Sequence, residues 1–159
     1  MNKLNWILIL IFSIVLFYQK CYIKTENLPC ENCLYQDKMM NCGPTALKMV
    51  LTDLNININL SEIERATNFQ KKAGVTLLDL YNYTKILGLK PNALRISENN
   101  LKNTPLPGIV FIKSSHFAVI DSINTEGYCF LRDPILGRIK THLLHLRKMW
   151  NGEILTLQH

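Results

Sequence analysis

The sequence of 159 residues has no internal repeat and no low-complexity tract, and its apolar content is ordinary for a globular protein. These features exclude a disordered chain and allow one domain with a sizeable core. The formal net charge is +6, but the basic residues are scattered and no basic stripe carries interleaved aromatic residues. We therefore predict no nucleic-acid partner, and an acidic or anionic partner is only slightly better supported.

A complete set of metal ligands is also missing. Cys30 and Cys33 form a lone CxxC pair, with no second CxxC and no well-spaced pair of histidines to complete a zinc site. The pair also lacks the strand-to-helix context of a redox motif, so we interpret it as incidental or structural. His142 and His145 lie three residues apart on an expected helix without a third ligand. We therefore expect no metal and no cofactor.

The longest apolar run, Leu4–Tyr18, is shorter than the ~20 residues that span a bilayer comfortably. No small-x-small cleavage site follows it, and the bulky and charged residues before Cys21 argue against lipid attachment. We therefore expect residues 1–20 to be a hydrophobic membrane anchor or an uncleaved signal. This predicts a single-pass membrane location, but lysines flank the run on both sides and leave its orientation open. Residues 21–34 are then a polar linker, and residues 35–159 form the folded domain.

Hydrophobic periodicity predicts helices in the first half of that domain. A helix that begins near Cys42 has apolar residues at helical spacing. These residues are Ala46, Leu47, Val50, Leu51 and Leu54. A later helix is capped by Thr76 and Asp79 and ends at Gly88. Its expected buried residues are Leu77, Leu80, Tyr81 and Ile86.

The pattern changes to strands after Gly108. Residues 109–112, 117–120 and 128–131 are rich in β-branched and aromatic residues and are separated by Ser, Asn and Gly. Further strands are expected at 138–141 and 154–157. Helices first and a mostly antiparallel sheet second indicate an α+β fold.

Cys42 is placed at the start of its helix in a way that favours reactivity. Gly43 and Pro44 suit a helix entry, because a proline in the first turn loses no hydrogen bond that would otherwise form. The unpaired amides there carry partial positive charge, which favours thiolate over thiol. A cysteine nucleophile requires this placement.

Two other residues complete a pattern for thiol-based acyl transfer. His116 starts a predicted strand and Asp133 follows another, although alone the first reads as a capping histidine and the second as a turn residue. In the order Cys, His, Asp, the imidazole takes the thiol proton and the carboxylate orients the ring. The Gln36 side-chain amide could join the Cys42 backbone amide in an oxyanion hole.

The stretch Gln36–Leu51, with its Q-x5-C-G-x-x-A-L spacing, resembles the bacteriocin-processing cysteine peptidases of family C39. Four further stretches resemble the family's motifs in order. These are Ala73–Leu77, Pro107–Val110 leading to His116–Ile120, Asp133–Gly137, and Trp150–Gly152.

The resemblance implies a papain-like fold that removes leader peptides after a small pair, usually Gly-Gly. It also implies that Cys42 is the nucleophile, His116 the general base and acid, Asp133 the orienting residue and Gln36 the oxyanion donor. Asn41 stands where the family often has Asp, and Ser115 where Asn or Gly often precedes the histidine. These departures bear on specificity more than on activity.

Many family members are the leading domain of an ATP-driven exporter. This chain has no multi-helix membrane part and no Gly-x4-Gly-Lys-Ser/Thr nucleotide loop, so we expect it to act alone or beside a separate ABC exporter.

Three functions fit these residues. The first is a membrane-tethered cysteine endopeptidase that removes double-glycine leaders from bacteriocin-like or other secreted peptides. The second is a module that binds leader peptides without cutting them and recruits them to an exporter. The third is an acyltransferase or amidase on the same fold. The separation of the Cys42 sulfur from the His116 ring in a structure tests the enzyme hypotheses.

Overall fold

A computed structural model of the chain describes residues 25–30, 32–70, 73–113 and 115–159. Its helices are α2 (Cys42–Asp53), α3 (Leu60–Ala66), α4 (Leu77–Ile86), α5 (Glu98–Leu101) and α6 (Leu143–Leu146). Its strands are β1 (Glu26–Leu28), β2 (Lys90–Arg95), β3 (Gly108–Ile112), β4 (His116–Ile123), β5 (Tyr128–Asp133), β6 (Gly137–His142) and β7 (Trp150–Gln158). The expected succession of helices and then strands is confirmed.

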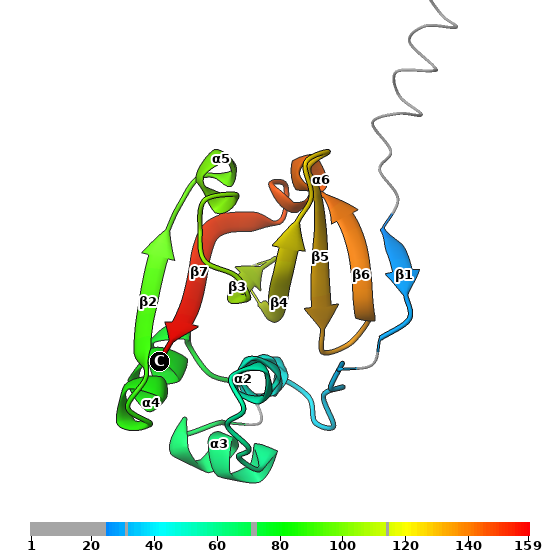
Figure 1. The fold of residues 1–159 in the computed structure, drawn as a ribbon. Coiled ribbons are helices and arrows are strands. Elements are labelled where there is room, and N and C mark those ends of the chain that lie inside the picture. Colours follow the sequence, from blue (N-terminus) through cyan, green and yellow to red (C-terminus); the bar gives the residue numbers. More distant parts are fainter. Residues whose placement is uncertain (1–24, 31, 71–72, 114) are drawn as a thin grey trace, which may run out of the picture.

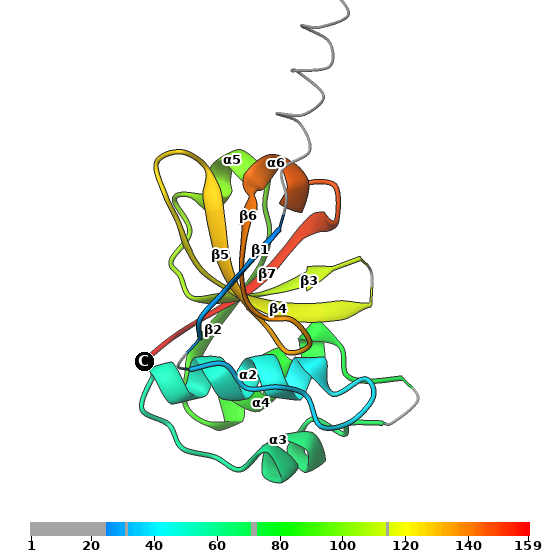
Figure 2. The ribbon, with the colours of Figure 1, turned by 90° about the vertical axis from the view of Figure 1, so that its right-hand side faces the viewer.

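The seven strands form one sheet in the order β1-β6-β5-β4-β3-β7-β2, and all the neighbouring pairs are antiparallel. Helices α2, α3 and α4 gather on one side of this sheet, and α5 and α6 lie at the opposite end (Figures 1 and 2). The predicted α+β fold with a mostly antiparallel sheet is therefore confirmed.

Alternation along the central strand β4 divides the core in two. Phe117 and Val119 pack with the apolar residues of α2, whereas Ala118 and Ile120 belong to a second cluster with residues of β5, β6 and α6. Successive side chains of a strand point to opposite faces, so one strand serves both clusters. The first cluster fixes helix α2 against the sheet.

Helix α4 has the predicted capping box, in which the Thr76 hydroxyl accepts from the Asp79 amide and the Asp79 carboxylate accepts from the Thr76 amide. Its buried face differs from the prediction, because Ile86 is 79% exposed and Tyr83 is buried. Leu80, Tyr83 and Thr84 are the buried residues of the helix, and they recur at the spacing of one helical face. Ile86 lies off that face.

The segment expected to be a linker contains ordered structure. Strand β1 pairs with β6 at the edge of the sheet, with Asn27 opposite Ile139. Cys30 and Cys33 form a disulfide, which is compatible with the expected structural role. The end of this segment is held against α2, where the Leu34 amide donates to the Met49 sulfur.

In the described ranges, no helix has both the length and the apolar character needed to cross a membrane. The longest of them, α2, has 12 residues, or about 18 Å, against a hydrocarbon core of about 30 Å. This finding corrects our expectation of a single-pass membrane location. The run Leu4–Tyr18, on which that expectation rested, lies outside the described residues, as does the whole of 1–20.

Candidate active site

Cys42 is the first residue of α2 and is 5% exposed. The helix start presses against β4, because a Cβ on Gly43 would lie 2.5 Å from the Val75 side chain and 3.1 Å from the Phe117 ring. Only glycine permits this approach without displacing its neighbours. The close packing brings the Cys42 thiol to the strand that begins at His116.

His116 and Asp133 meet because β4 and β5 are antiparallel neighbours. His116 starts β4 and Asp133 ends β5, so both lie at the same end of the strand pair. His116 Nε2 is 3.0 Å from Asp133 Oδ1. The same carboxylate oxygen accepts from the amides of Ile135 at 2.7 Å and Leu136 at 3.1 Å. The turn after β5 therefore fixes the carboxylate, which in turn fixes the ring.

The surroundings of Cys42 favour its thiolate. Burial raises the pKa of the thiol, but hydrogen bonds with the His116 ring and the Phe117 backbone, together with charge attraction to His116, bring it below its ordinary value. Because Nε2 of His116 is engaged by Asp133, Nδ1 is the ring nitrogen left for the sulfur. Cys42 and His116 also line the same cavity.

The pKa values of His116 and Asp133 are shifted in the directions that favour their charged forms. Burial lowers the pKa of His116, but hydrogen bonds with Asp133 and Cys42 outweigh it and raise the pKa to about 9. Burial raises the pKa of Asp133, but the hydrogen bond to His116 and those from the Ile135 and Leu136 amides bring it below its ordinary value. All three shifts favour the charged forms, namely the Cys42 thiolate, the His116 imidazolium and the Asp133 carboxylate.

Gln36 lies beside the Asp133 turn rather than free in solvent. Its backbone amide donates to the Pro134 carbonyl at 2.9 Å, and its side-chain Nε2 donates to the Lys38 carbonyl at 3.2 Å. Its Oε1 is buried and has no hydrogen-bond partner among the residues that the structure describes. One N–H of the side-chain amide remains available to a ligand.

All four residues line one cavity of about 510 Å³, in which most of the other lining residues are apolar. The lining consists of Thr25, Gln36, Met39, Met40, Cys42, Ile112, Lys113, Ser115, His116, Asp133, Ile135, Leu136, Ile139, His145 and Met149. Met39, which lines this cavity, is 79% exposed. An exposed apolar side chain of this size is typical of a surface that binds a ligand. The sequence-predicted set is therefore brought together at a site that can receive a ligand.

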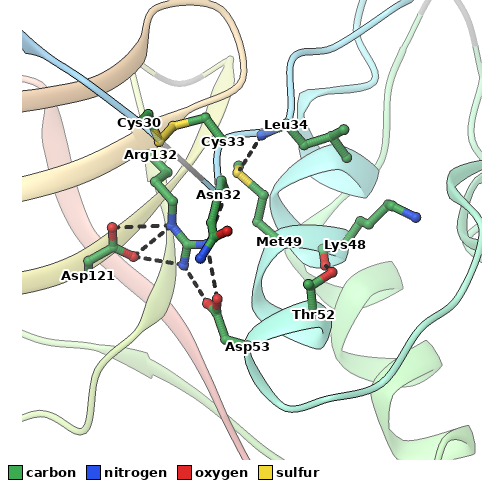
Figure 3. Close-up of polar contacts among 10 residues, drawn as sticks. All are labelled: Cys30, Asn32, Cys33, Leu34, Lys48, Met49, Thr52, Asp53, Asp121 and Arg132. Carbon is green, nitrogen blue, oxygen red and sulfur yellow. Dashed lines mark hydrogen bonds and ion pairs between the residues drawn. A yellow bond between two sulfur atoms is a disulfide. The ribbon is translucent and has the colours of Figure 1, made fainter.

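A second polar cluster ties the cysteine helix to the histidine and aspartate strands (Figure 3). The Arg132 guanidinium donates to Asp121 of β4 and to Asp53 at the end of α2. Arg132 is buried and immediately precedes Asp133. Our sequence reasoning missed this cluster, although an arginine next to Leu131 in an apolar strand was a signal that it needs buried partners.

The remaining histidines and the other free cysteine of the described residues do not form a second site. His142 caps α6 by accepting from the Leu144 amide, while His145 lines the cavity, so the two do not form a ligand pair. No group of three metal-ligating side chains occurs within the described ranges. Cys129 is fully buried, and burial raises its pKa to about 11, so it is an apolar core residue. Trp150 is also buried.

Comparison with known proteins shows the family of this chain. The sequence model of the Peptidase C39 family matches residues 31–159. An uncharacterized protein of Methanothermobacter thermautotrophicus is 25% identical over 137 residues, which cover 86% of this chain and 95% of that protein.

Two solved structures share the fold. One is a double glycine motif protease from an AMS/PCAT transporter in complex with the leader peptide, with a TM-score of 0.73 and 21% identity, covering 84% of this chain and 91% of the other. The other is the peptidase domain of Streptococcus ComA, a bi-functional ABC transporter involved in a quorum sensing pathway, with a TM-score of 0.73 and 18% identity, covering 79% and 96%. The predicted papain-like fold is thereby confirmed. This chain belongs to the Peptidase C39 family and is a cysteine peptidase.

Proposed function

We propose that this chain removes leader peptides by cutting after a double-glycine motif. The observation that carries the proposal is that Cys42, His116 and Asp133 line one cavity, where His116 Nε2 lies 3.0 Å from Asp133 Oδ1. The likeness to a double glycine motif protease bound to a leader peptide supports the same substrate class. The resemblance to family C39 implies that the substrates are bacteriocin-like or other secreted peptides with such leaders.

Each of the four residues has a role in the proposed reaction. The Cys42 thiolate attacks the carbonyl carbon of the second glycine, and the resulting oxyanion accepts hydrogen bonds from the Cys42 amide and the free N–H of Gln36. The His116 imidazolium, oriented by Asp133, gives its proton to the leaving amine. His116 then takes a proton from water, which attacks the thioester and releases the leader's new carboxylate.

We further propose that residues 35–159 hold this machinery and that a separate ABC exporter is the partner. The structural likeness to a peptidase domain of a bi-functional ABC transporter supports such a partnership. In this arrangement the exporter receives the peptide once the leader has been cut.

A synthetic peptide tests the function directly. The wild-type protein should cut a leader ending in Gly-Gly and joined to a short cargo, and mass spectrometry should place the cut after the second glycine. A matched peptide with Val-Val at the same positions should stay intact, because its side chains would crowd the sulfur. An intact Gly-Gly peptide after prolonged incubation with reduced protein would contradict the proposal.

The pH dependence of cleavage follows from the two shifted groups. The pKa of Cys42 is lowered, so its thiolate persists below the usual range, whereas the pKa of His116 is raised to about 9, so its imidazolium persists up to there. We expect kcat to fall as pH rises through about 9, because the leaving amine then loses its proton donor. Alkylation of Cys42 by iodoacetamide should not fall over that range, because the thiolate remains. A parallel fall in both rates would argue against these roles.

A further inference from the structure

Asn41, the residue before the nucleophile, is fully buried and does not cap its own helix with its side chain. Its Nδ2 instead donates to Asp37 Oδ1 at 2.7 Å and to Glu64 Oε1 at 2.9 Å. Its Oδ1 accepts from the Lys38 amide at 3.4 Å. Asn41 therefore binds the loop 36–41 to helix α3 and closes that loop on itself.

Glu64 holds the same loop at a second point. It is a buried residue of α3, and its other carboxylate oxygen pairs with the ammonium group of Lys38. The Lys38 carbonyl in turn accepts from the side chain of Gln36. A chain of polar contacts thus runs from Glu64 through Lys38 to Gln36, and from Glu64 through Asn41 to the start of α2.

We propose that Glu64, acting through Asn41 and Lys38, is a positioning residue that sets the oxyanion hole. This inference rests on the proposed function and deepens it. The Gln36 amide and the Cys42 amide lie at the two ends of the loop that Glu64 clamps. Fixing the loop aligns both donors with the oxygen that becomes negative during attack.

The clamp also accounts for asparagine at position 41, where the family often has aspartate. The side chain at 41 faces two carboxylates, those of Asp37 and Glu64. Only a side chain with N–H groups satisfies both, because an ionised carboxylate accepts hydrogen bonds and donates none. An aspartate there would bring three carboxylates together, so Asn41 and Glu64 depend on each other.

Size-matched variants of the reduced full-length protein test this inference with the Gly-Gly leader assay. We expect Glu64→Gln to lower kcat about tenfold and Asn41→Asp to lower it about 100-fold, with KM changed less than about threefold. The rate of Cys42 alkylation by iodoacetamide should change less than about twofold in Glu64→Gln, because this variant adds no charge beside the thiolate and leaves His116 in place. The double variant Asn41→Asp/Glu64→Gln should recover part of the loss, because the introduced amide donates to the introduced carboxylate.

Glu62→Gln is the matched control, since Glu62 is an exposed carboxylate on the same helix, and it should leave kcat and KM within about twofold. Lys38→Met, at a partly exposed position, provides a variant that should fold and still lose kcat several-fold. Wild-type kcat in Glu64→Gln and Asn41→Asp, or an equal fall of kcat and alkylation in Glu64→Gln, would overturn the positioning role. Failure of the wild-type protein to cut the leader would instead overturn the proposed function itself.

Discussion

Replacing Cys42 with alanine should lower the rate of leader cleavage by about 10⁴- to 10⁶-fold, the loss expected when a nucleophile that acts as a unit with its base is removed. The thiol lies at the start of α2, and its pKa is lowered beside His116. Alanine removes the sulfur without adding bulk, so the cavity and the leader-binding surface should stay intact. Cleavage is followed by mass spectrometry and binding by calorimetry with the same Gly-Gly peptide.

Cys129→Ala is the matched control for that variant. Cys129 is a buried thiol whose pKa is raised to about 11, so its removal should leave the cleavage rate within about twofold. Wild-type protein that binds the leader and never cuts it would favour the non-cleaving recruitment module. Cleavage by Cys42→Ala at the wild-type rate would remove Cys42 from the mechanism.

Arg132→Ala should lower the free energy of unfolding by about 3 kcal/mol, because it leaves the carboxylates of Asp53 and Asp121 close together without their shared cation. For a domain of this size the loss corresponds to a fall of about 10 °C in Tm. Urea denaturation and thermal melting measure it. Since the cluster links α2 to β4 and β5, kcat should fall as well.

Arg147→Ala is the control for the stability effect. Arg147 is 61% exposed and pairs with Glu98, so its loss should change the free energy of unfolding by less than about 1 kcal/mol. Equal melting temperatures for the Arg132 and Arg147 variants would show that the buried cluster does not hold the helix to the sheet.

Local signals were sufficient for much of the site. The apolar spacing after Cys42 predicted α2, and the antiparallel pairing of the strands at His116 and Asp133 brought those residues together as expected. Periodicity describes each helix and strand by itself, and the catalytic pattern together with the resemblance to a known family supplied the expectation that Cys42, His116 and Asp133 come together. The roles of these residues stay a prediction until variants are assayed.

Contacts between distant residues were not predictable where neither a catalytic pattern nor the family resemblance pointed to them. Arg132 and Asp53 lie 79 residues apart, and Asn41 and Glu64 lie 23 apart, so no local pattern pairs them. The CxxC spacing fitted several chemistries, and the structure shows a disulfide. The exposure of Ile86 depends on how α4 is rotated against the sheet, which its sequence left ambiguous.

Strand β1 has a practical consequence for truncated versions of this protein. The family match begins at residue 31, but β1 lies before it and covers the outer side of β6. A chain cut at the family boundary would leave the outward N–H and C=O groups of β6 at residues 138–140, where β1 pairs, as an open template. Such a fragment would be prone to edge-to-edge aggregation, so a shortened protein for purification should retain residues 25–30.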